Sequence, residues 1–415
     1  MNVPKVLIGI TGGIAAYKIC EVTSTLAKAG VEVRVLMTDQ AQGFVSAVTF
    51  AALSRHAVYT DKDFWSAGQA RPLHIELGEW ADVFLIAPLT ANTLSKLAHG
   101  LADNLLTNTV LASVCPILLA PAMNTDMWQQ AVVQKNWAKL QADARYHAVG
   151  PGAGRLACDR IGTGRMAEPT EIVTALQSLL HTQGQRDLTG KHLLISTGST
   201  QEPIDPVRFI GNPATGRMGI ALAQAAIHRG AQVTLVHGPL TADVVSTMPT
   251  GQTAQMQTYP ITTAAEMESA LLSHLPQADW VIMAAAVADV RPAQTATHKL
   301  PKKELPTNLP LTTVPDIVSQ LAQKKAAHQL IVGFAAQTGD IITPALGKLK
   351  RKQLDAIVAN PVDKAGSGFG SVDNEAVVLL PSGEQIAIAH GSKLALSHQL
   401  YDILISRPIP QSYAS

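Results

Sequence analysis

The sequence predicts two tandem α/β domains, each a three-layer arrangement with a mainly parallel sheet between two layers of helices. The chain has 415 residues, whereas a single domain usually contains roughly 100–200 residues. The same local pattern of strand, glycine turn, helix and strand begins at Lys5 and again at Lys191. A polar, glycine-bearing segment, residues 181–190, lies between the two patterns and is the best candidate for a linker. We therefore expect one domain over residues 1–187 and a second over residues 188–415.

Each pattern has the form of the βαβ unit that opens an α/β domain. In the first, an apolar run over residues 5–10 precedes a glycine turn, a helix that ends at Gly30, and a second apolar run over residues 31–38. In the second, the apolar runs are residues 191–197 and 232–239, and the helix between them also ends at a glycine. Glycine is common just past a helix C-terminus, and a strand on either side of such a helix indicates a βαβ unit.

Several further short apolar runs end in small residues and alternate with helical stretches, as buried parallel strands do. These runs cover residues 83–88, 116–121, 280–286, 330–336 and 355–360. Ligands in such folds bind beyond the carboxyl ends of the strands. The loops that follow these runs are therefore where functional side chains are expected.

The composition excludes several classes of protein. Hydrophobic residues make up 47% of the chain and charged residues 15%, whereas charged residues are about a quarter of an ordinary soluble chain. Lys and Arg number 32 against 31 Asp and Glu, so the charge gives no case for a nucleic-acid partner. No apolar stretch reaches the roughly 18 residues of a membrane span, and no basic leader with a cleavage site is present, which predicts a cytoplasmic protein without a membrane partner. A charge-poor surface favours a homo-oligomer.

Cysteine and histidine offer few candidates for reactive groups. The three cysteines form no CxxC pair, and an odd number makes a poor disulfide framework. Cys20 and Cys115 lie in apolar segments and are expected in the core, whereas Cys158 lies in a glycine-rich loop where burial gains little. His74 lies in an apolar stretch, where a histidine is more often structural than functional. No HExxH motif or His/Cys cluster indicates a metal site.

Polar groups follow the predicted strands of the first half. Gly12 and Gly13 allow a tight turn that directs backbone N–H groups toward an anion such as a phosphate, although a purely structural turn is equally compatible with them. The turn is not a GxGxxG fingerprint, and the second strand, which ends at Met37 and Thr38, has no acidic residue at the position that reads a ribose, so a mononucleotide fits better than a dinucleotide. Later loops add uncharged side chains suited to a ring with carbonyl and N–H groups: Thr90, Asn92 and Asn124.

The second half contains a glycine loop and two groups of lysines. The loop, residues 211–218, nearly matches a phosphate loop, but Arg217 and Met218 replace the Lys-Ser/Thr pair, so it is either an anion-binding loop or only a tight turn. Three lysines, at 299, 302 and 303, lie within five residues. Taken without the surrounding motifs, such a run of lysines is usually a solvent-exposed face. Lys348 and Lys352 lie one helical turn apart and can face one phosphate tail.

Together the motifs resemble a known family. TGGIAAYK, LHIELG, APLTAN, PAMN and ACDRIGTGRM occur in this order and resemble the FMN-dependent phosphopantothenoylcysteine decarboxylases. The second half resembles phosphopantothenate–cysteine ligases, and nearly the whole chain is similar to the bifunctional coenzyme A biosynthesis family that fuses the two. The resemblance implies a flavodoxin-like flavoprotein domain, then a Rossmann-like ligase domain, in a homo-oligomer built from trimers, with a dodecamer as one form.

The resemblance implies roles for residues of the first half. His74 matches the family's catalytic histidine, Asn124 the asparagine that holds the substrate carboxylate, and Cys158 the cysteine of a flexible substrate clamp. FMN accepts electrons from the thiol end of the substrate so that CO2 can leave, and the Cys158 thiol then supplies a proton. The clamp of the family reads Cys-Gly-acid, whereas Asp159 and Arg160 follow the cysteine here. The implied FMN contacts are Gly12, Gly13, Ile14, Thr38, Thr90 and Asn92.

For the second half, the resemblance implies that the carboxylate of 4'-phosphopantothenate attacks CTP to give an acyl-cytidylate, which the amine of L-cysteine then opens. Arg208 and Asn212 match substrate contacts and Lys299 the catalytic lysine. Mg²⁺ is expected with CTP, and Asp289 is its candidate ligand. The spacing does not distinguish CTP from ATP. This chain departs from the family at two places: Gln337 stands where the family commonly has Glu, and Ala214-Thr215 stands where it commonly has Ser-Ser. The implied nucleotide contacts are Ala284, Ala285, Asp289, Pro315, Asp316, Ile317, Val318, Phe334, Lys348 and Lys352.

Two other functions are compatible with parts of the sequence. The first is a flavoprotein decarboxylase of another class, acting on peptidyl cysteine or an aromatic acid, with an unrelated nucleotide-binding tail. It would lack the set Arg208, Asn212 and Lys299, which this chain has. The second is a non-catalytic FMN-binding regulatory protein. Such relatives can lose the clamp cysteine or the ligase lysines, whereas both are kept here.

Overall fold

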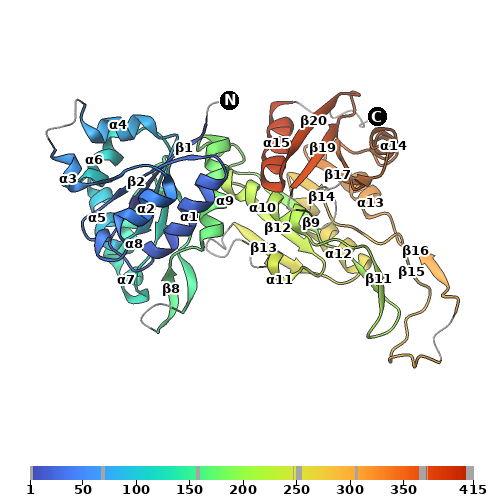
Figure 1. Cartoon of the computed structure of the whole chain (residues 1–415). Helices are drawn as coiled ribbons and strands as arrows, with labels where there is room; N and C mark the ends of the chain where they lie inside the picture. Colours follow the sequence, from blue (N-terminus) through green and yellow to red (C-terminus); the bar gives the residue numbers. More distant parts are fainter. Residues whose placement is uncertain are drawn as a thin grey trace. The chain divides into compact units, whose positions relative to one another are not determined.

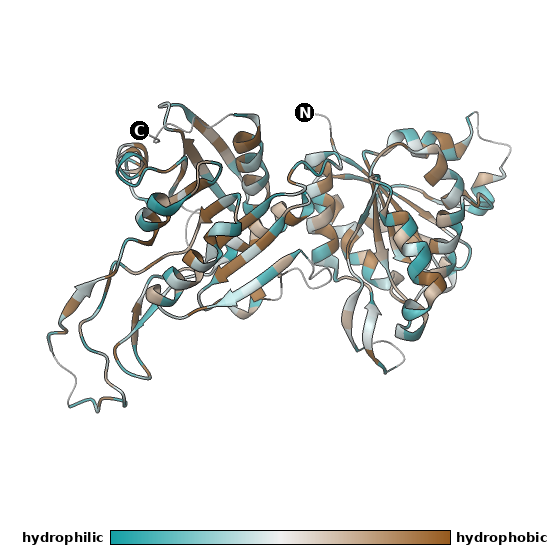
Figure 2. Ribbon diagram, turned by 180° about the vertical axis from the view of Figure 1, so that it is seen from behind, coloured by the Kyte–Doolittle hydropathy of each residue, from teal (hydrophilic) through white to brown (hydrophobic). Residues whose placement is uncertain are grey.

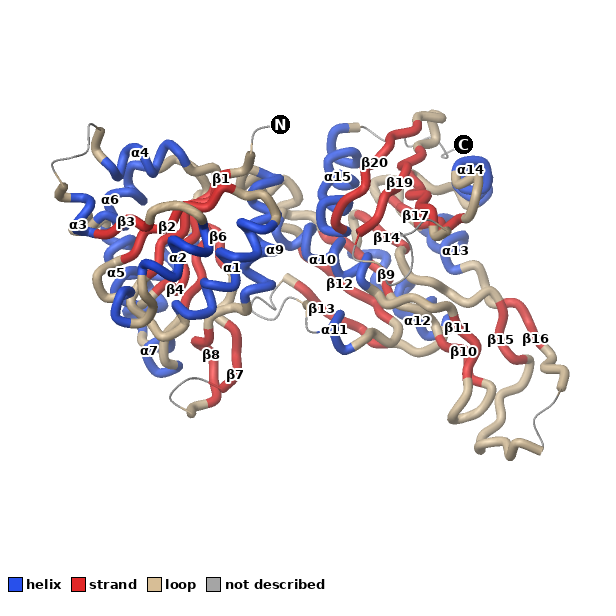
Figure 3. Tube along the Cα trace, in the orientation of Figure 1, coloured by secondary structure: helices blue, strands red, loops and turns tan. Residues whose placement is uncertain are grey.

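The computed structural model describes residues 3–66, 71–155, 159–245, 247–248, 255–303, 307–363, 371 and 373–407. The chain divides into two compact units between Gln185 and Arg186. Each unit has a sheet between two layers of helices (Figures 1 and 3), which confirms the predicted pair of three-layer α/β domains. None of the helices in these ranges is long and apolar enough to cross a membrane.

The sheet of the first unit has six parallel strands in the order β3-β2-β1-β4-β5-β6. This order places the switch point between β1 and β4, and the crevice at such a point is where open α/β sheets bind ligands. The strands are β1 (Lys5–Ile10), β2 (Glu32–Met37), β3 (Val58–Thr60), β4 (Val83–Leu89), β5 (Ile117–Pro121) and β6 (Tyr146–Ala148).

Helices cover both faces of this sheet. The first of them, α1 (Ala16–Lys28), buries Ile19, Val22 and Leu26, which recur every three or four residues as an amphipathic helix requires. On the same face lie α2 (Ala47–Ser54) and α9 (Pro169–Thr182). The opposite face is covered by α4 (Leu73–Trp80), α5 (Ala91–His99), α6 (Leu105–Ala112) and α8 (Ala131–Gln141). Short helices α3 (Asp61–Phe64) and α7 (Thr125–Gln129), and a hairpin of β7 (Gly152–Arg155) and β8 (Ile161–Arg165), complete the unit.

The sheet of the second unit has eight strands in the order β13-β12-β9-β14-β17-β18-β19-β20. The strands from β13 to β18 are parallel, and the last two pairings are antiparallel. The strands are β9 (His192–Thr197), β12 (Gln232–His237), β13 (Met256–Pro260), β14 (Trp280–Met283), β17 (Leu330–Gln337), β18 (Ala356–Pro361), β19 (Asp373–Leu379) and β20 (Gln385–Ser392).

Helices also cover both faces of the second sheet. One face carries α10 (Arg217–His228), α11 (Ala242–Val245) and α15 (Lys393–Ser406). The other carries α12 (Ala264–His274), α13 (Ile317–Lys324) and α14 (Ile342–Arg351). Figure 2 shows hydrophobic residues concentrated in the strands of both sheets, which form the two cores.

Two short ribbons extend from the second sheet and lie side by side in Figure 1. One pairs β10 (Gln201–Pro203) with β11 (Phe209–Gly211), and the other pairs β15 (Val290–Pro292) with β16 (Leu311–Thr313). Neither these ribbons nor the antiparallel pair β19 and β20 is predicted from the sequence. Strands of three residues are too short to show a hydrophobic period, and antiparallel edge strands lack the continuous apolar run of a buried parallel strand.

Candidate active sites

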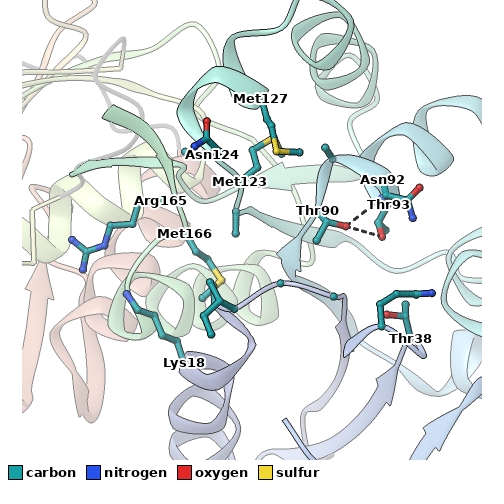
Figure 4. Close-up of a pocket in the computed structure, with 18 of the residues that line it drawn as sticks. Lys18, Thr38, Thr90, Asn92, Thr93, Met123, Asn124, Met127, Arg165 and Met166 are labelled. Carbon is teal, nitrogen blue, oxygen red and sulfur yellow. Dashed lines mark hydrogen bonds between the residues drawn. The ribbon is translucent and has the colours of Figure 1, made fainter. Parts of the chain in front are cut away.

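The first unit contains a cavity of about 860 Å³ beyond the carboxyl ends of β1, β4 and β5. This volume lies within the range of about 300–1,000 Å³ that is usual for ligand sites. Figure 4 shows Asn92, Thr90, Thr38 and Asn124 around this cavity. All the predicted FMN contacts line it, together with Asn124: Gly12, Gly13, Ile14, Thr38, Thr90 and Asn92.

The glycine turn of this cavity is held by close backbone packing. A Cβ added to Gly12 would lie 2.5 Å from the Cβ of Gln40, so only glycine keeps the turn against the loop that follows β2. The Thr11 hydroxyl donates to the carbonyl oxygen of Pro88 at 2.5 Å and accepts from the N–H of Thr90 at 3.2 Å. These bonds join the loops after β1 and β4. The start of α1 thus faces the cavity, an arrangement that favours an anion.

The cavity has one neutral side and one cationic side. Thr38, Thr90 and Asn92 lie on the first, whereas Lys18 and Arg165 lie on the other (Figure 4). The ammonium of Lys18 and the guanidinium of Arg165 contact the Glu168 carboxylate at 2.9 and 2.5 Å. Ion pairs this exposed contribute only about 0–1 kcal/mol, so a bound anion can replace the carboxylate at little cost. A flavin therefore fits, with polar groups for its ring and cations for its phosphate or that of a substrate.

The hairpin β7–β8 lies against the loop that carries Asn124. A Cβ added to Gly164 would lie 2.4 Å from the carbonyl oxygen of Met123, and the Met123 N–H donates to Gly164 at 2.9 Å. The guanidinium of Arg160 forms an ion pair with Asp126 of α7. The residue that departs from the family pattern thus helps to hold the hairpin beside the cavity. Cys158, which lies between β7 and β8 in the sequence, is outside the described residues.

His74 is not among the described residues that line this cavity. It lies in the first turn of α4, and its ring meets that of Phe64 edge to face at 5.4 Å. Its Nδ1 is buried and has no hydrogen-bond partner in the described part of the chain. The structure therefore does not bring His74 and Asn124 to one cavity within a single chain. Cys115 is buried as predicted, and burial raises the pKa of its thiol to about 11.

The second unit contains a cavity of about 690 Å³ beyond the ends of β9, β14 and β17. Asn212 lines it, and its side-chain amide donates to the carbonyl oxygen of Val287 at 3.0 Å. All the predicted nucleotide contacts line this cavity as well: Ala284, Ala285, Asp289, Pro315, Asp316, Ile317, Val318, Phe334, Lys348 and Lys352.

Close contact between α10 and β9 shapes this second cavity. A Cβ added to Gly219 would lie 2.2 Å from the Cβ of Thr197, so this glycine allows the helix to approach the strand. Gly216 adopts a φ of 86° at the start of α10, and its carbonyl oxygen accepts a bond from the Thr197 hydroxyl at 2.9 Å. The loop of residues 211–218 therefore does more than reverse the chain. It directs the start of a twelve-residue helix toward the cavity.

The charges around this cavity are mainly positive. The Lys352 ammonium lies 3.0 Å from the Asp316 carboxylate. Burial raises the pKa of Asp316, but its bonds to Lys352 and Ser319 outweigh that effect and lower the pKa below its ordinary value. Three further cations line the cavity that are not among the predicted nucleotide contacts: Arg217, Arg351 and Lys393. Arg217 and Arg351 lie within segments that the sequence singled out, whereas Lys393 lies outside them.

Arg208 and Lys299 are not among the described residues lining the second cavity. Arg208 lies in the turn between β10 and β11, and Lys299 lies between β15 and β16, next to Leu300. Asp205, whose side chain is fully buried, links Arg208 to Leu300. Its carboxylate accepts from the Arg208 guanidinium at 2.8 Å and from the N–H of Leu300 at 3.2 Å. Burial raises the pKa of Asp205, but three backbone N–H donors and the Arg208 charge outweigh it and lower the pKa.

The described residues of the second cavity offer too few protein ligands to hold a magnesium ion unless a bound nucleotide contributes its phosphates. No group of three or more His, Cys, Asp or Glu side chains that could hold a metal occurs within the described ranges. Asp289 and Asp316 are the acidic side chains among the described residues that line the cavity. Mg²⁺ is commonly held by one or two carboxylates together with substrate phosphates, so this donor set suits an ion that arrives with a nucleotide.

Comparison with known proteins matches both halves of the chain. Residues 1–181 match the Flavoprotein family model, and residues 188–407 match the model described as DNA/pantothenate metabolism flavoprotein C-terminal domain. The chain is 42% identical over 400 residues to the coenzyme A biosynthesis bifunctional protein CoaBC of Bacillus subtilis, covering 96% of each chain. It is 41% identical over 418 residues to the protein of that name from Mycobacterium tuberculosis, covering 98% of this chain and 97% of the relative.

Two solved structures are similar to separate halves. The C-terminal domain of a CoaBC protein is 32% identical, with a TM-score of 0.44, and the match covers 53% of this chain and 96% of that one. The FMN-binding protein AtHal3 is 37% identical, with a TM-score of 0.39, and the match covers 42% of this chain and 96% of that one. Since the CoaBC relatives match over nearly the full length at above 40% identity, the chain belongs to the family of bifunctional coenzyme A biosynthesis enzymes, which join a phosphopantothenate–cysteine ligase and a phosphopantothenoylcysteine decarboxylase.

Proposed function

We propose that the chain converts 4'-phosphopantothenate and L-cysteine into 4'-phosphopantetheine, with CTP-dependent ligation over residues 188–415 and FMN-dependent decarboxylation over residues 1–187. The observation that carries this proposal is the grouping of the predicted contacts. The six FMN contacts line one cavity and the ten nucleotide contacts line the other. Within each set, residues that lie far apart in the sequence line the same cavity, as a shared ligand requires. FMN identified by mass after denaturation of the purified chain tests the cofactor.

In the decarboxylation step, the residues of the chain bind, orient and move protons. The glycine turn and the start of α1 hold the FMN phosphate, while Thr38, Thr90 and Asn92 contribute hydrogen bonds. FMN, when bound, would accept two electrons from the thiol end before CO2 leaves and return them to the decarboxylated product, so that the reaction is redox-neutral overall. The amide of Asn124 orients the substrate carboxylate. His74 acts as the base and Cys158 returns the proton after CO2 has left, and such acid–base help contributes about 10²–10⁴-fold.

In the ligation step, the phosphopantothenate carboxylate attacks the α-phosphate of CTP and pyrophosphate leaves. The cysteine amine then attacks the acyl-cytidylate, and CMP leaves. Negative charge accumulates at the α-phosphate, so Lys299, Lys348 and Lys352 stabilise it. Asp289 would hold an Mg²⁺ ion that arrives with CTP, and that ion would neutralise part of the phosphate charge. Arg208 and Asn212 hold the phosphopantothenate.

Two observations support a homo-oligomer for the decarboxylase half, and its construction from trimers, as in a dodecamer, rests on the resemblance. Among the described residues, twelve of the seventeen exposed large hydrophobic side chains lie before His181, including Trp65 at 76% and Val114 at 89% exposure. Apolar surface of this extent favours contact with another chain. His74 is also absent from the described lining of its own chain's cavity, so we propose that a neighbouring copy supplies it. A cytoplasmic location remains a prediction from composition.

Mixing two inactive variants tests this sharing of a site. His74→Asn removes the base, whereas Asn124→Asp keeps a helix-capping side chain but repels the substrate carboxylate. Each variant alone is expected to lose decarboxylation, because each removes one required group. Oligomers assembled from both variants are expected to regain part of the activity, since some sites then combine both intact residues. Mixed oligomers verified by native mass spectrometry that remain as inactive as the single variants would contradict the proposal.

The two alternative functions have less support. A flavoprotein decarboxylase of another class with an unrelated nucleotide-binding tail would lack the set Arg208, Asn212 and Lys299, which this chain has. A non-catalytic FMN-binding regulatory protein would not need a second cavity lined by all ten nucleotide contacts, nor the cations around it. The match to bifunctional relatives over 96% of the chain also favours two activities over one.

A further inference from the structure

The second cavity contains a buried cation that the ligase residues described above do not account for. Lys393 is the first residue of α15 and lines the cavity, and only 8% of its surface is exposed. Its ammonium donates to the carbonyl oxygen of Asp373 at 3.3 Å. In the described part of the chain it forms no ion pair within 4.0 Å. The Asp373 carboxylate acts on this ammonium only from beyond ion-pair distance, and a buried ammonium without an ion-pair partner is costly.

A second cation lines the same cavity. Arg217 is the first residue of α10, and its guanidinium pairs with Asp243 through one terminal nitrogen. Its Nε is buried and has no hydrogen-bond partner among the described residues. Burial and the charge of Arg217 lower the pKa of Lys393, whereas Asp373 opposes this effect. The two positive charges are therefore close enough to act on each other.

Both cations lie at the unfavourable end of a helix. The start of a helix carries a partial positive charge and is stabilised by anions, whereas cations are favoured at the other end. Lys393 and Arg217 are each the first residue of a helix of twelve or more residues. Helix stability does not explain either residue, since both oppose the dipole. A multiply charged anion in the cavity would neutralise both cations and both helix starts together.

The lining as a whole indicates the same kind of ligand. Five cationic side chains from the described residues line the cavity, against two acidic ones, Asp289 and Asp316. Asp316 is already paired with Lys352. The excess of positive charge suits a polyphosphate better than a single carboxylate.

We propose that Lys393 and Arg217 bind the β- and γ-phosphates of the nucleotide and hold the pyrophosphate that leaves when the acyl-cytidylate forms. The inference rests on the proposed ligase function and adds two binding residues to it. The bond between the α- and β-phosphates breaks, and its electron pair leaves with the pyrophosphate, whose negative charge the two cations stabilise. Hydrogen bonds to charged groups contribute about 1.5–3 kcal/mol, which corresponds to roughly a ten- to hundred-fold change in affinity.

The test uses the full chain and inorganic pyrophosphate as the probe, with Kd measured by calorimetry. Lys393→Met is expected to raise the pyrophosphate Kd by about ten- to one-hundred-fold and the KM for CTP in the same direction. The unfolding temperature of ligand-free Lys393→Met is expected to equal or exceed that of the ligand-free wild type, because the substitution removes a buried charge that has no ion-pair partner. The transition to follow is the one that pyrophosphate shifts to higher temperature in the wild type. Arg217→Met should also weaken pyrophosphate binding, and Lys393→Arg should keep most of it.

The matched control is Lys350→Met, which removes an exposed lysine of α14 that is not among the lining residues. It should leave the pyrophosphate Kd unchanged. A structural lysine would behave in the opposite way: Lys393→Met would lower the unfolding temperature, or prevent folding, and keep the Kd of any folded protein. Either result overturns the proposal. A wild-type chain that releases no pyrophosphate from CTP would overturn the ligase function itself, and this inference with it.

Discussion

Replacing Lys299 with alanine is expected to lower pyrophosphate release from CTP by about a hundred- to a thousand-fold, because a positioned donor for phosphoryl charge is lost. Decarboxylation of supplied phosphopantothenoylcysteine should stay unchanged, since we propose that the other unit carries out that reaction. The side chain of Lys299 is exposed, and the next residue, Leu300, is held by Asp205 and Arg208. The substitution therefore removes a charge without disturbing a packed core. Both activities are measured on one preparation, by released pyrophosphate and by released CO2.

The control for this experiment is Lys350→Ala, an exposed lysine of the same unit that is not among the lining residues of the second cavity. It should leave both activities intact. If Lys299→Ala lowered both activities equally, the assignment of one reaction to each unit would be wrong. If Lys299→Ala lowered neither activity, Lys299 would belong to a solvent-exposed face without a catalytic role, which is the alternative interpretation of this lysine group.

The second large effect is expected for Gly12→Ala, which should lose bound FMN and decarboxylation while ligation continues. The added Cβ would lie 2.5 Å from that of Gln40, so the turn after β1 must move away from the loop after β2. Overpacking of this kind costs about 1–3 kcal/mol, and a displaced turn no longer directs its N–H groups at the phosphate. A fall in FMN affinity of about ten- to one-hundred-fold follows. Flavin absorbance of the purified protein and titration with FMN measure it.

Gly43→Ala is the matched control, because a Cβ at this position meets nothing within 4 Å and the residue lies in the same unit. It should purify with as much flavin as the wild type. A Gly12→Ala protein with normal flavin content and normal decarboxylation would show that the turn does not bind the cofactor. Loss of flavin from both variants would point to general instability of the unit.

The general architecture could be predicted because it depends on local patterns. The βαβ units starting at Lys5 and Lys191 combine apolar runs with helices closed by glycine, and both form as expected. Elements that depend on distant contacts could not be predicted in this way. The ribbon β10–β11 has three residues in each strand and is held partly by the buried Asp205 turn. The edge strands β19 and β20 exist because β18 presents a partner for pairing.

The site residues also fall into those that local sequence patterns predict and those that depend on distant contacts. Thr90, Asn92 and Asn124 could be predicted because each follows a strand, and the carboxyl ends of parallel strands meet at one edge of the sheet. The roles of Lys299 and Arg208 came from resemblance alone, and neither is among the described lining residues of the second cavity. Lys393 could not have been predicted, since the fold brings together the starts of two helices that lie far apart in the sequence.

The most direct test of the two-step function is mass spectrometry of the products formed from 4'-phosphopantothenate, L-cysteine and Mg²⁺ with either CTP or ATP. The wild-type chain is expected to form 4'-phosphopantetheine with CTP, with release of CMP, pyrophosphate and CO2. Phosphopantothenoylcysteine should accumulate in the Gly12→Ala protein, and no new product should form in the Lys299→Ala protein. A wild-type chain that makes neither phosphopantothenoylcysteine nor phosphopantetheine with either nucleotide would contradict the account.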